Sequence, residues 1–205
     1  MNTILLSNLY LAPIDYYIAL SQSDNVLIEQ YDHFEKQTYR NRCRILTSNG
    51  PMDLVVPIIR PKEKCPTKDI LISYQEKWQQ THWRAIESAY NSSPFFEYYK
   101  EDFEPFFTQK INYLIDLNNG LMETLLQLIH LPVNYQLTDT YKKKEEVVSQ
   151  GIEDLRKAFH PKQTDKIVTK SYYQVFDQKF GFQGGLSIID LLFNLGPESL
   201  IYLKS

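Results

Sequence analysis

The chain has few of the residues that build disulfide scaffolds, metal centres or phosphate-binding loops. Its 205 residues include only two cysteines, four histidines and seven glycines. Cys43 and Cys65 lack the short spacing of zinc ligands and are more typical of free thiols in a reducing compartment. There is no glycine-rich phosphate loop, no HExxH helix and no GxSxG elbow. We therefore predict no metal site, and no motif indicates a cofactor.

Neither sign of charge dominates, and no apolar run is long. The formal net charge is -3, whereas non-specific nucleic-acid binding needs a basic footprint. No apolar stretch approaches the roughly 20 residues that span a bilayer, and the N-terminus lacks the basic start of a signal peptide. These absences predict a cytoplasmic protein that neither binds nucleic acid nor inserts into a membrane.

What the chain does contain predicts a globular α/β protein. Hydrophobic residues make up 43% of it, and the length suits one domain. We expect a single domain over residues 1–205, with a loop-rich, mobile segment at 142–171. Thr3 to Ser7 predicts a buried strand, Pro13 the start of a helix, and Val26 to Gln30 a second strand. Such a unit makes a parallel pair, so we predict a mixed β-sheet with helices packed on it.

The loop after the first strand would lie at the carboxyl end of this sheet, the usual ligand side. It carries Ser7, Asn8 and Tyr10, which are candidates to line a pocket or only to make the turn. Further along, the apolar spacing and turn residues predict strands at 69–73, 131–141 and 172–176. They predict helices at 78–89, 94–107, 112–130 (with a break at 118–120), 152–160 and 187–197. In the last of these, we expect Ser187 and Asp190 to form a capping box.

A basic stretch followed by a hairpin signal lies near the middle of the first half. Arg40, Arg42 and Arg44 fall at every second residue, so on a strand all three would project from one face. Asn49-Gly50 is a strong hairpin turn, and the answering strand, Met52 to Ile58, is apolar enough to be interior. We predict a hairpin with one buried arm and one arm that carries fixed positive charge.

The arginine row has a functional and a purely structural interpretation. With Lys36, it can hold phosphate or carboxylate through charge-assisted, bidentate hydrogen bonds, with Asn41 orienting the ligand. Alternatively, it is a solvated or edge-strand face, or its charges are answered within the chain. The candidates for such internal partners are Glu29, Asp32, Glu35 and Asp53.

Histidine is scarce, and His82 is the best candidate for proton transfer. It lies on a predicted helix between Trp78 and Trp83, where an imidazole can act as a general base or pack as a core residue against indole. His33 is a weaker candidate beside the basic stretch. A third hypothesis places a nucleotide phosphate on the amides of Ala12–Ile14, at the start of the first helix.

Several segments together resemble the WbqC-like protein family of bacteria, in the form found in Bacteroidetes-type bacteria. They are Tyr10-Leu11-Ala12-Pro13, Lys36-Gln37-Thr38-Tyr39-Arg40-Asn41-Arg42, Asn49-Gly50-Pro51, Trp78 with His82-Trp83, Ser93-Pro94-Phe95-Phe96 and Asp190-Leu191-Leu192-Phe193-Asn194-Leu195-Gly196-Pro197. The resemblance runs almost end to end. It implies a role with surface-polysaccharide genes, including O-antigen loci, and a transferase activity, for instance of an aminoacyl group such as glycine. Many members carry His-Gln-Pro after the first strand, where this chain has Ser7-Asn8-Leu9.

These observations lead to one hypothesis and one rival. The first is a group transferase that acts on an anionic or nucleotide-linked sugar, with His82 catalytic. Its substrate-binding residues would be Lys36, Arg40, Asn41, Arg42, Trp78, Tyr10 and Asn8. It requires the arginines and His82 to meet at one cavity. The rival is a non-catalytic binding or scaffold protein of cell-envelope assembly, in which the arginines pair with the chain's own carboxylates.

Overall fold

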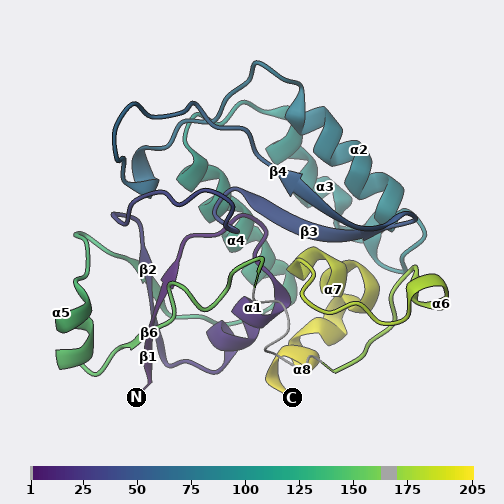
Figure 1. The fold of residues 1–205 in the computed structure, drawn as a ribbon. Coiled ribbons are helices and arrows are strands. Elements are labelled where there is room, and N and C mark those ends of the chain that lie inside the picture. Colours follow the sequence, from purple (N-terminus) through teal and green to yellow (C-terminus); the bar gives the residue numbers. More distant parts are fainter. Residues whose placement is uncertain (1, 163–169) are drawn as a thin grey trace.

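The strands of the protein form a parallel sheet and a separate antiparallel hairpin. A computed structural model describes residues 2–162 and 170–205 (Figure 1). The parallel sheet has the order β5-β2-β1-β6 and the hairpin is β3-β4. The strands are β1 (Thr3–Ser7), β2 (Asn25–Glu29), β3 (Arg42–Thr47), β4 (Gly50–Val55), β5 (Tyr135–Leu137) and β6 (Glu153–Asp154). The predicted α/β fold is confirmed, with the two kinds of strand pairing in different sheets.

The first strand–helix–strand unit forms as predicted. β1 pairs in parallel with β2 from Thr3–Asn25 to Ser7–Glu29, and α1 (Ile14–Ser21) connects them. β1 is one of the two inner strands, and its Leu5 and Leu6 are both buried although they point to opposite faces. Since the neighbouring strands run parallel to β1, the loops that follow them leave from the same edge.

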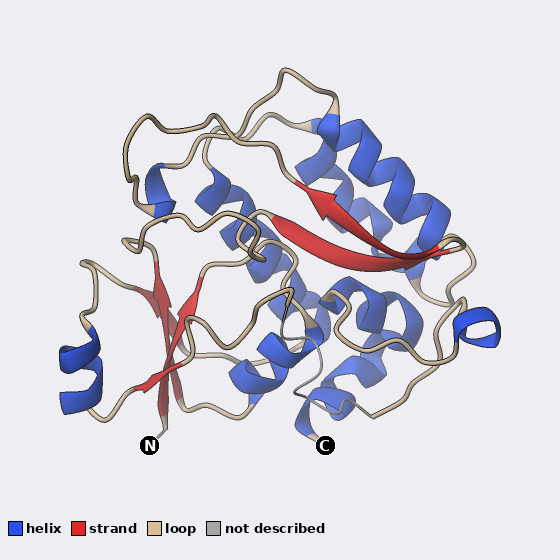
Figure 2. Cartoon of the chain, in the orientation of Figure 1, coloured by secondary structure: helices blue, strands red, loops and turns tan. Residues whose placement is uncertain are grey.

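Helices lie beside both sheets (Figure 2). α2 (Trp78–Tyr90), α3 (Phe96–Thr108) and α4 (Leu114–Ile129) pack in sequence order, whereas α7 (Ile188–Leu195) returns to contact α1 and α3, and α8 (Ser199–Lys204) packs on α1. Phe193 of α7 meets the rings of Tyr90, Phe96 and Phe103 at centroid distances of 5.2, 5.2 and 5.5 Å. Short helices complete the chain: η1 (Thr67–Asp69), α5 (Lys144–Ser149), α6 (Asp177–Phe180) and η2 (Gly196–Glu198). Of the helices in the described ranges, none has the length and apolar character needed to cross a bilayer.

The predicted hairpin is confirmed, but the buried position of its second arm is wrong. Thr47 pairs with Gly50 across a two-residue turn, and Gly50 adopts a φ of +103° that L-residues rarely adopt. In β4, however, Met52, Asp53 and Val55 are exposed. The reason is that β4 pairs only with β3, so the hairpin lies at the surface and only one of its faces is covered (Figure 1).

Several element boundaries also differ from the prediction. Residues 152–160 form β6 and a turn instead of a helix, and 172–176 form no strand. In the predicted strand 69–73, Asp69 ends η1, and Leu71 and Ile72 make only isolated bridges. The helix α3 starts at Phe96, because Ser93 Oγ bonds to the Tyr90 carbonyl instead of capping. The expected mobile segment includes 163–169, which lie outside the described residues; the preceding part contains α5 and β6.

Two polar residues have structural roles that the sequence did not indicate. Asn118 is buried, and α4 runs past it without the predicted break because its amide bonds to the loop after β1. Asp190 makes no capping box: it is buried and accepts hydrogen bonds from Tyr90, Tyr172 and Gln174. Its burial raises the pKa of this carboxyl above its ordinary value.

Candidate functional site

The three arginines do not project from one face. Arg40 lies before β3 and turns inward, where its guanidinium pairs with Asp32 and lies 3.6 Å from Glu35. Arg44 makes two hydrogen bonds to Asp53, and Arg42 lies 3.7 Å from the same carboxylate. The prediction of one charged row is therefore wrong for Arg40, and each of the three guanidinium groups lies near a carboxylate of the chain.

His82 lies apart from the arginines. Its side chain is buried, 4% exposed, with Nδ1 3.0 Å from the Tyr10 hydroxyl and the Trp78 ring at a centroid distance of 5.1 Å. Burial lowers the pKa of His82 to about 4, so the imidazole is neutral at pH 7. It borders an open groove of about 280 Å³ between β4 and α2, and no arginine lines that groove. The expected meeting of the arginines and His82 at one cavity is wrong.

Asn8 and Tyr10 serve the fold around the first loop. Both are buried. The Asn8 side chain donates a hydrogen bond to Asn119 Oδ1 at 2.6 Å and accepts one from Asn118 Nδ2 at 2.8 Å. The third hypothesis, a phosphate on the amides of Ala12–Ile14, is also wrong. The Ile14 amide donates to the Leu186 carbonyl at 3.1 Å, so it is closed to a ligand.

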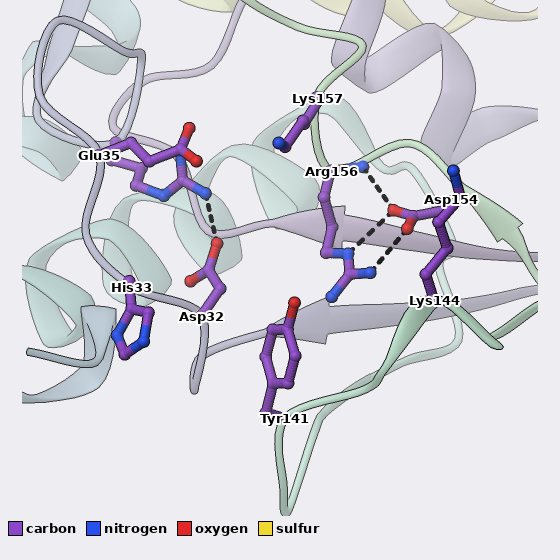
Figure 3. A pocket seen from close by; sticks show the side chains of 9 residues that line it. Asp32, His33, Glu35, Tyr141, Lys144, Asp154, Arg156 and Lys157 are labelled. Carbon is purple, nitrogen blue, oxygen red and sulfur yellow. Dashed lines mark hydrogen bonds and ion pairs between the residues drawn. The ribbon is translucent and has the colours of Figure 1, made fainter. Parts of the chain in front are cut away.

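A different set of residues forms a pocket of about 440 Å³ at the carboxyl edge of the parallel sheet (Figure 3). We call it the sheet-edge pocket. Its lining comes from the segments that follow β2, β5 and β6: Asp32, His33, Glu35, Arg40, Tyr141, Lys144, Asp154, Arg156 and Lys157. Of these residues, Arg40 and His33 were functional candidates on sequence grounds, and Asp32 and Glu35 were named as internal partners of the arginines. The volume is in the range that holds a small-molecule ligand.

One side of the pocket is organised by Glu29 and Arg156. Glu29 is fully buried at the end of β2 and accepts hydrogen bonds from Thr138 Oγ1 at 2.9 Å and the Lys142 amide at 3.0 Å. Arg156 lies 3.4 Å from Glu29 and holds Asp154 by two hydrogen bonds of 2.9 and 2.6 Å. These bonds lower the pKa of Asp154. The loops after β2, β5 and β6 are thus joined by charge-assisted bonds before any ligand arrives.

The other side is organised by Asp32. Its Oδ1 accepts from Thr67 Oγ1 at 2.7 Å and its Oδ2 from Arg40. Ser7, at the end of β1, links the two sides: its Oγ accepts from Arg40 at 3.1 Å and donates to the Arg156 carbonyl at 3.1 Å. The floor of the pocket is therefore a buried, hydrogen-bonded network with fixed geometry.

The rim is exposed and carries the groups available to a ligand. Figure 3 shows the Tyr141 hydroxyl pointing into the space between Asp32 and Arg156. Lys157 makes no ion pair or hydrogen bond within the part of the chain that the structure describes. Carboxylates accept hydrogen bonds from hydroxyls, while arginine and lysine neutralise negative charge, so the pocket suits a polar ligand with both kinds of group. Over the same residues, no cluster of histidine, cysteine and carboxylate side chains could hold a metal.

A parallel sheet with a polar pocket at the carboxyl ends of its strands defines an α/β protein with a candidate ligand site. The chain belongs to the WbqC-like protein family, whose family model matches residues 9–202. It is 23% identical, over 212 residues, to the uncharacterized protein Rv1507c of Mycobacterium tuberculosis (strain ATCC 25618 / H37Rv); the match covers 92% of this chain and 91% of that protein. No solved structure matches the chain.

The sequence contained two signals for the sheet-edge pocket. Ser7 was expected at the carboxyl end of the sheet, and Glu29 ends a buried strand whose following segment carries Asp32, which places these residues at the ligand side of a parallel sheet. No signal pointed to Asp154, Arg156 and Lys157, because residues 152–160 were predicted to form a helix and β6 has only two residues.

Proposed function

We propose that the protein is a group transferase of bacterial surface-polysaccharide biosynthesis and that the sheet-edge pocket receives the sugar part of its substrate. The observation that carries this proposal is the meeting of three strand-end segments around one pocket that mixes carboxylates with cations. Family membership supports the pathway. The free thiols Cys43 and Cys65 support a cytoplasmic location.

The family resemblance suggests aminoacyl transfer, and the groups on the rim offer the proton acceptor and the cations that such a reaction needs. A hydroxyl or amine of the sugar attacks the carbonyl carbon of an activated aminoacyl donor, such as a glycyl group. A new C–O or C–N bond forms, the bond to the donor's leaving group breaks, and the attacking group loses its proton. We assign that proton to His33, which is exposed and lines the pocket, in preference to His82, which is buried elsewhere. The rim cations Lys144 and Lys157 would balance the charge of a nucleotide or phosphate on the substrate.

A binding titration with matched variants tests the site. We expect at least one of a panel of uridine-diphosphate sugars to bind the wild type in isothermal titration calorimetry. We expect Lys157→Ala to weaken that binding about tenfold, since a charge-assisted contact contributes roughly 1.5–3 kcal/mol. Lys204→Ala is the control, because Lys204 is exposed on α8 and lines none of the pockets described. Equal binding by the wild type and Lys157→Ala would remove the sheet-edge pocket from the proposal.

A second candidate, a non-catalytic binding or scaffold protein of cell-envelope assembly, is favoured by a specific observation. Arg40 and Arg44 pair with carboxylates of the chain, and Arg42 lies 3.7 Å from one. The groove that His82 borders is open. The two candidates differ in the His33→Ala variant. A transferase would keep its affinity for the sugar nucleotide and lose transfer of a radiolabelled glycyl group, whereas a scaffold would bind the ligand with no transfer in either protein.

A further inference from the structure

A second pocket lies on the other side of the segment that forms one wall of the sheet-edge pocket. It has a volume of about 360 Å³, and we call it the basic pocket. Its lining residues are Phe34, Lys36, Gln37, Asn41, Arg42, Ile58 and Arg60. Along residues 33–42, Glu35 and Arg40 face the sheet-edge pocket while Lys36, Asn41 and Arg42 face the basic pocket.

The lining of the basic pocket carries three cations, one of which, Arg42, lies 3.7 Å from Asp53, a carboxylate outside the lining. Lys36, Arg42 and Arg60 line it, and no lining residue is a carboxylate. The sheet-edge pocket differs, since Asp32, Glu35 and Asp154 face its cations. Three like charges around one cavity repel one another unless a bound anion neutralises them. In a chain whose net charge is -3, this local excess of positive charge is not a consequence of overall composition.

The hydrogen-bonding capacity of these cations is largely unused. Lys36 and Arg60 make no hydrogen bond or ion pair with another described residue. Arg42 shares Asp53 with Arg44, which takes both carboxylate oxygens at 2.7 and 3.2 Å, while Arg42 itself is 3.7 Å away. The Arg42 Nε is buried and has no partner. A buried donor without a partner costs free energy that a bound anion would recover.

The backbone of the wall is also held in an uncommon conformation. Gln37 has a φ of +59°, in the left-handed region that a non-glycine residue occupies at a cost of about 1–2 kcal/mol. Thr38 Oγ1 fixes the turn through a hydrogen bond of 2.8 Å to the Glu35 carbonyl. This turn brings Lys36 and Gln37 to the basic pocket, opposite Arg60.

We propose that the basic pocket is a binding site for a phosphate or diphosphate group of a small-molecule ligand. Phosphate oxygens accept the fork of hydrogen bonds that arginine presents, and Lys36 adds a mobile charge. Phe34 and Ile58 give the pocket an apolar side. The site does not depend on the transfer reaction proposed above, because anion binding requires neither the sheet-edge pocket nor turnover.

Inorganic pyrophosphate is the probe, and titration of the full-length chain by calorimetry at low salt is the measurement. We expect one saturable site in the wild type and a loss of affinity of about tenfold in Arg60→Gln, for one charge-assisted contact removed. Arg42→Gln should lose at least as much. Arg60 is exposed and unpaired, so its replacement leaves the fold intact even if that of Arg42 does not.

Two matched variants separate this site from the rest of the molecule. Arg84→Gln removes an exposed arginine of α2 that lines none of the described pockets, and Lys157→Ala removes a cation of the sheet-edge pocket. Arg84→Gln should bind pyrophosphate as the wild type does, whereas Lys157→Ala reports whether the probe enters the sheet-edge pocket, where Lys157 is proposed to meet a phosphate. If Arg60→Gln binds as tightly as Arg84→Gln, or if only Lys157→Ala loses affinity, the basic pocket is not the anion site.

Discussion

Acidification is expected to destabilise this protein through His82. The side chain is buried between Tyr10 and Trp78, and burial lowers its pKa from 6.5 to about 4. The unfolded chain therefore binds the proton first. Above pH 6.5 the imidazole is neutral in both states and has no effect. As the pH falls below 6.5 the unfolded state gains the proton alone, so the free energy of unfolding falls, and the loss levels off below about pH 4.

The magnitude follows from the two pKa values. One pKa unit corresponds to about 1.4 kcal/mol, so the loss attributable to His82 is about 2 kcal/mol at pH 5 and about 3 kcal/mol at pH 4. Burial also raises the pKa of Asp15 to about 6, which acts in the opposite direction. That contribution is common to the wild type and a His82 variant, so it cancels when the two are compared.

Urea unfolding at pH 7, 6, 5 and 4 measures the effect in the wild type and in His82→Gln, which cannot titrate. Between pH 7 and pH 5, we expect the wild type to lose about 2 kcal/mol of unfolding free energy relative to His82→Gln. If the two stabilities follow parallel curves over that range, His82 is not a buried neutral imidazole, and it returns as a candidate for proton transfer at neutral pH.

Two further substitutions test what holds the pocket and the C-terminal helix in place. Asp32→Ala leaves the Arg40 guanidinium, whose side chain is 6% exposed, without its closest carboxylate, and should lower the free energy of unfolding by about 3 kcal/mol in urea titrations. Asp69→Ala, which breaks an exposed pair with Lys68, should change little; an equal loss in both would refute the buried pair. Gly196→Ala should lower stability by about 2 kcal/mol more than Gly181→Ala, because both glycines have positive φ but only a Cβ at Gly196 meets the Phe95 ring, at 2.6 Å. Equal thermal shifts for the two alanine variants would show that the ring moves aside freely.

Apolar spacing predicted the elements that bury a continuous face. The helices α1, α2 and α4 were recognised because a buried stripe leaves a period in the sequence, and β1 and β2 were recognised as short apolar runs. The hairpin was recognised from Asn49-Gly50, although the two-residue turn lies one residue earlier, at 48–49, and Gly50 begins β4. The family was recognised from short motifs spread along the chain, and the match over residues 9–202 confirms it.

Pairing with distant partners could not be predicted in this way. β6 has two residues and forms only because it pairs with Ile4 and Leu5 of β1, which lie far away in the sequence. The direction of Arg40 depends on Asp32, which a loop brings beneath it. Nor does periodicity distinguish a covered strand face from an exposed one, so β4 was expected to be interior.

By itself, the sequence determined the class of fold, the family and the places where charge gathers, because composition, periodicity and turn chemistry are local properties. Only the tertiary structure decided which charges neutralise one another and which face a cavity. It paired Arg40 with Asp32, buried His82 away from the arginines, and left Lys36, Arg42 and Arg60 around a pocket without a carboxylate. The physical reason is that an ion pair and a pocket depend on distances between segments, and those distances are set by the packing of the whole chain.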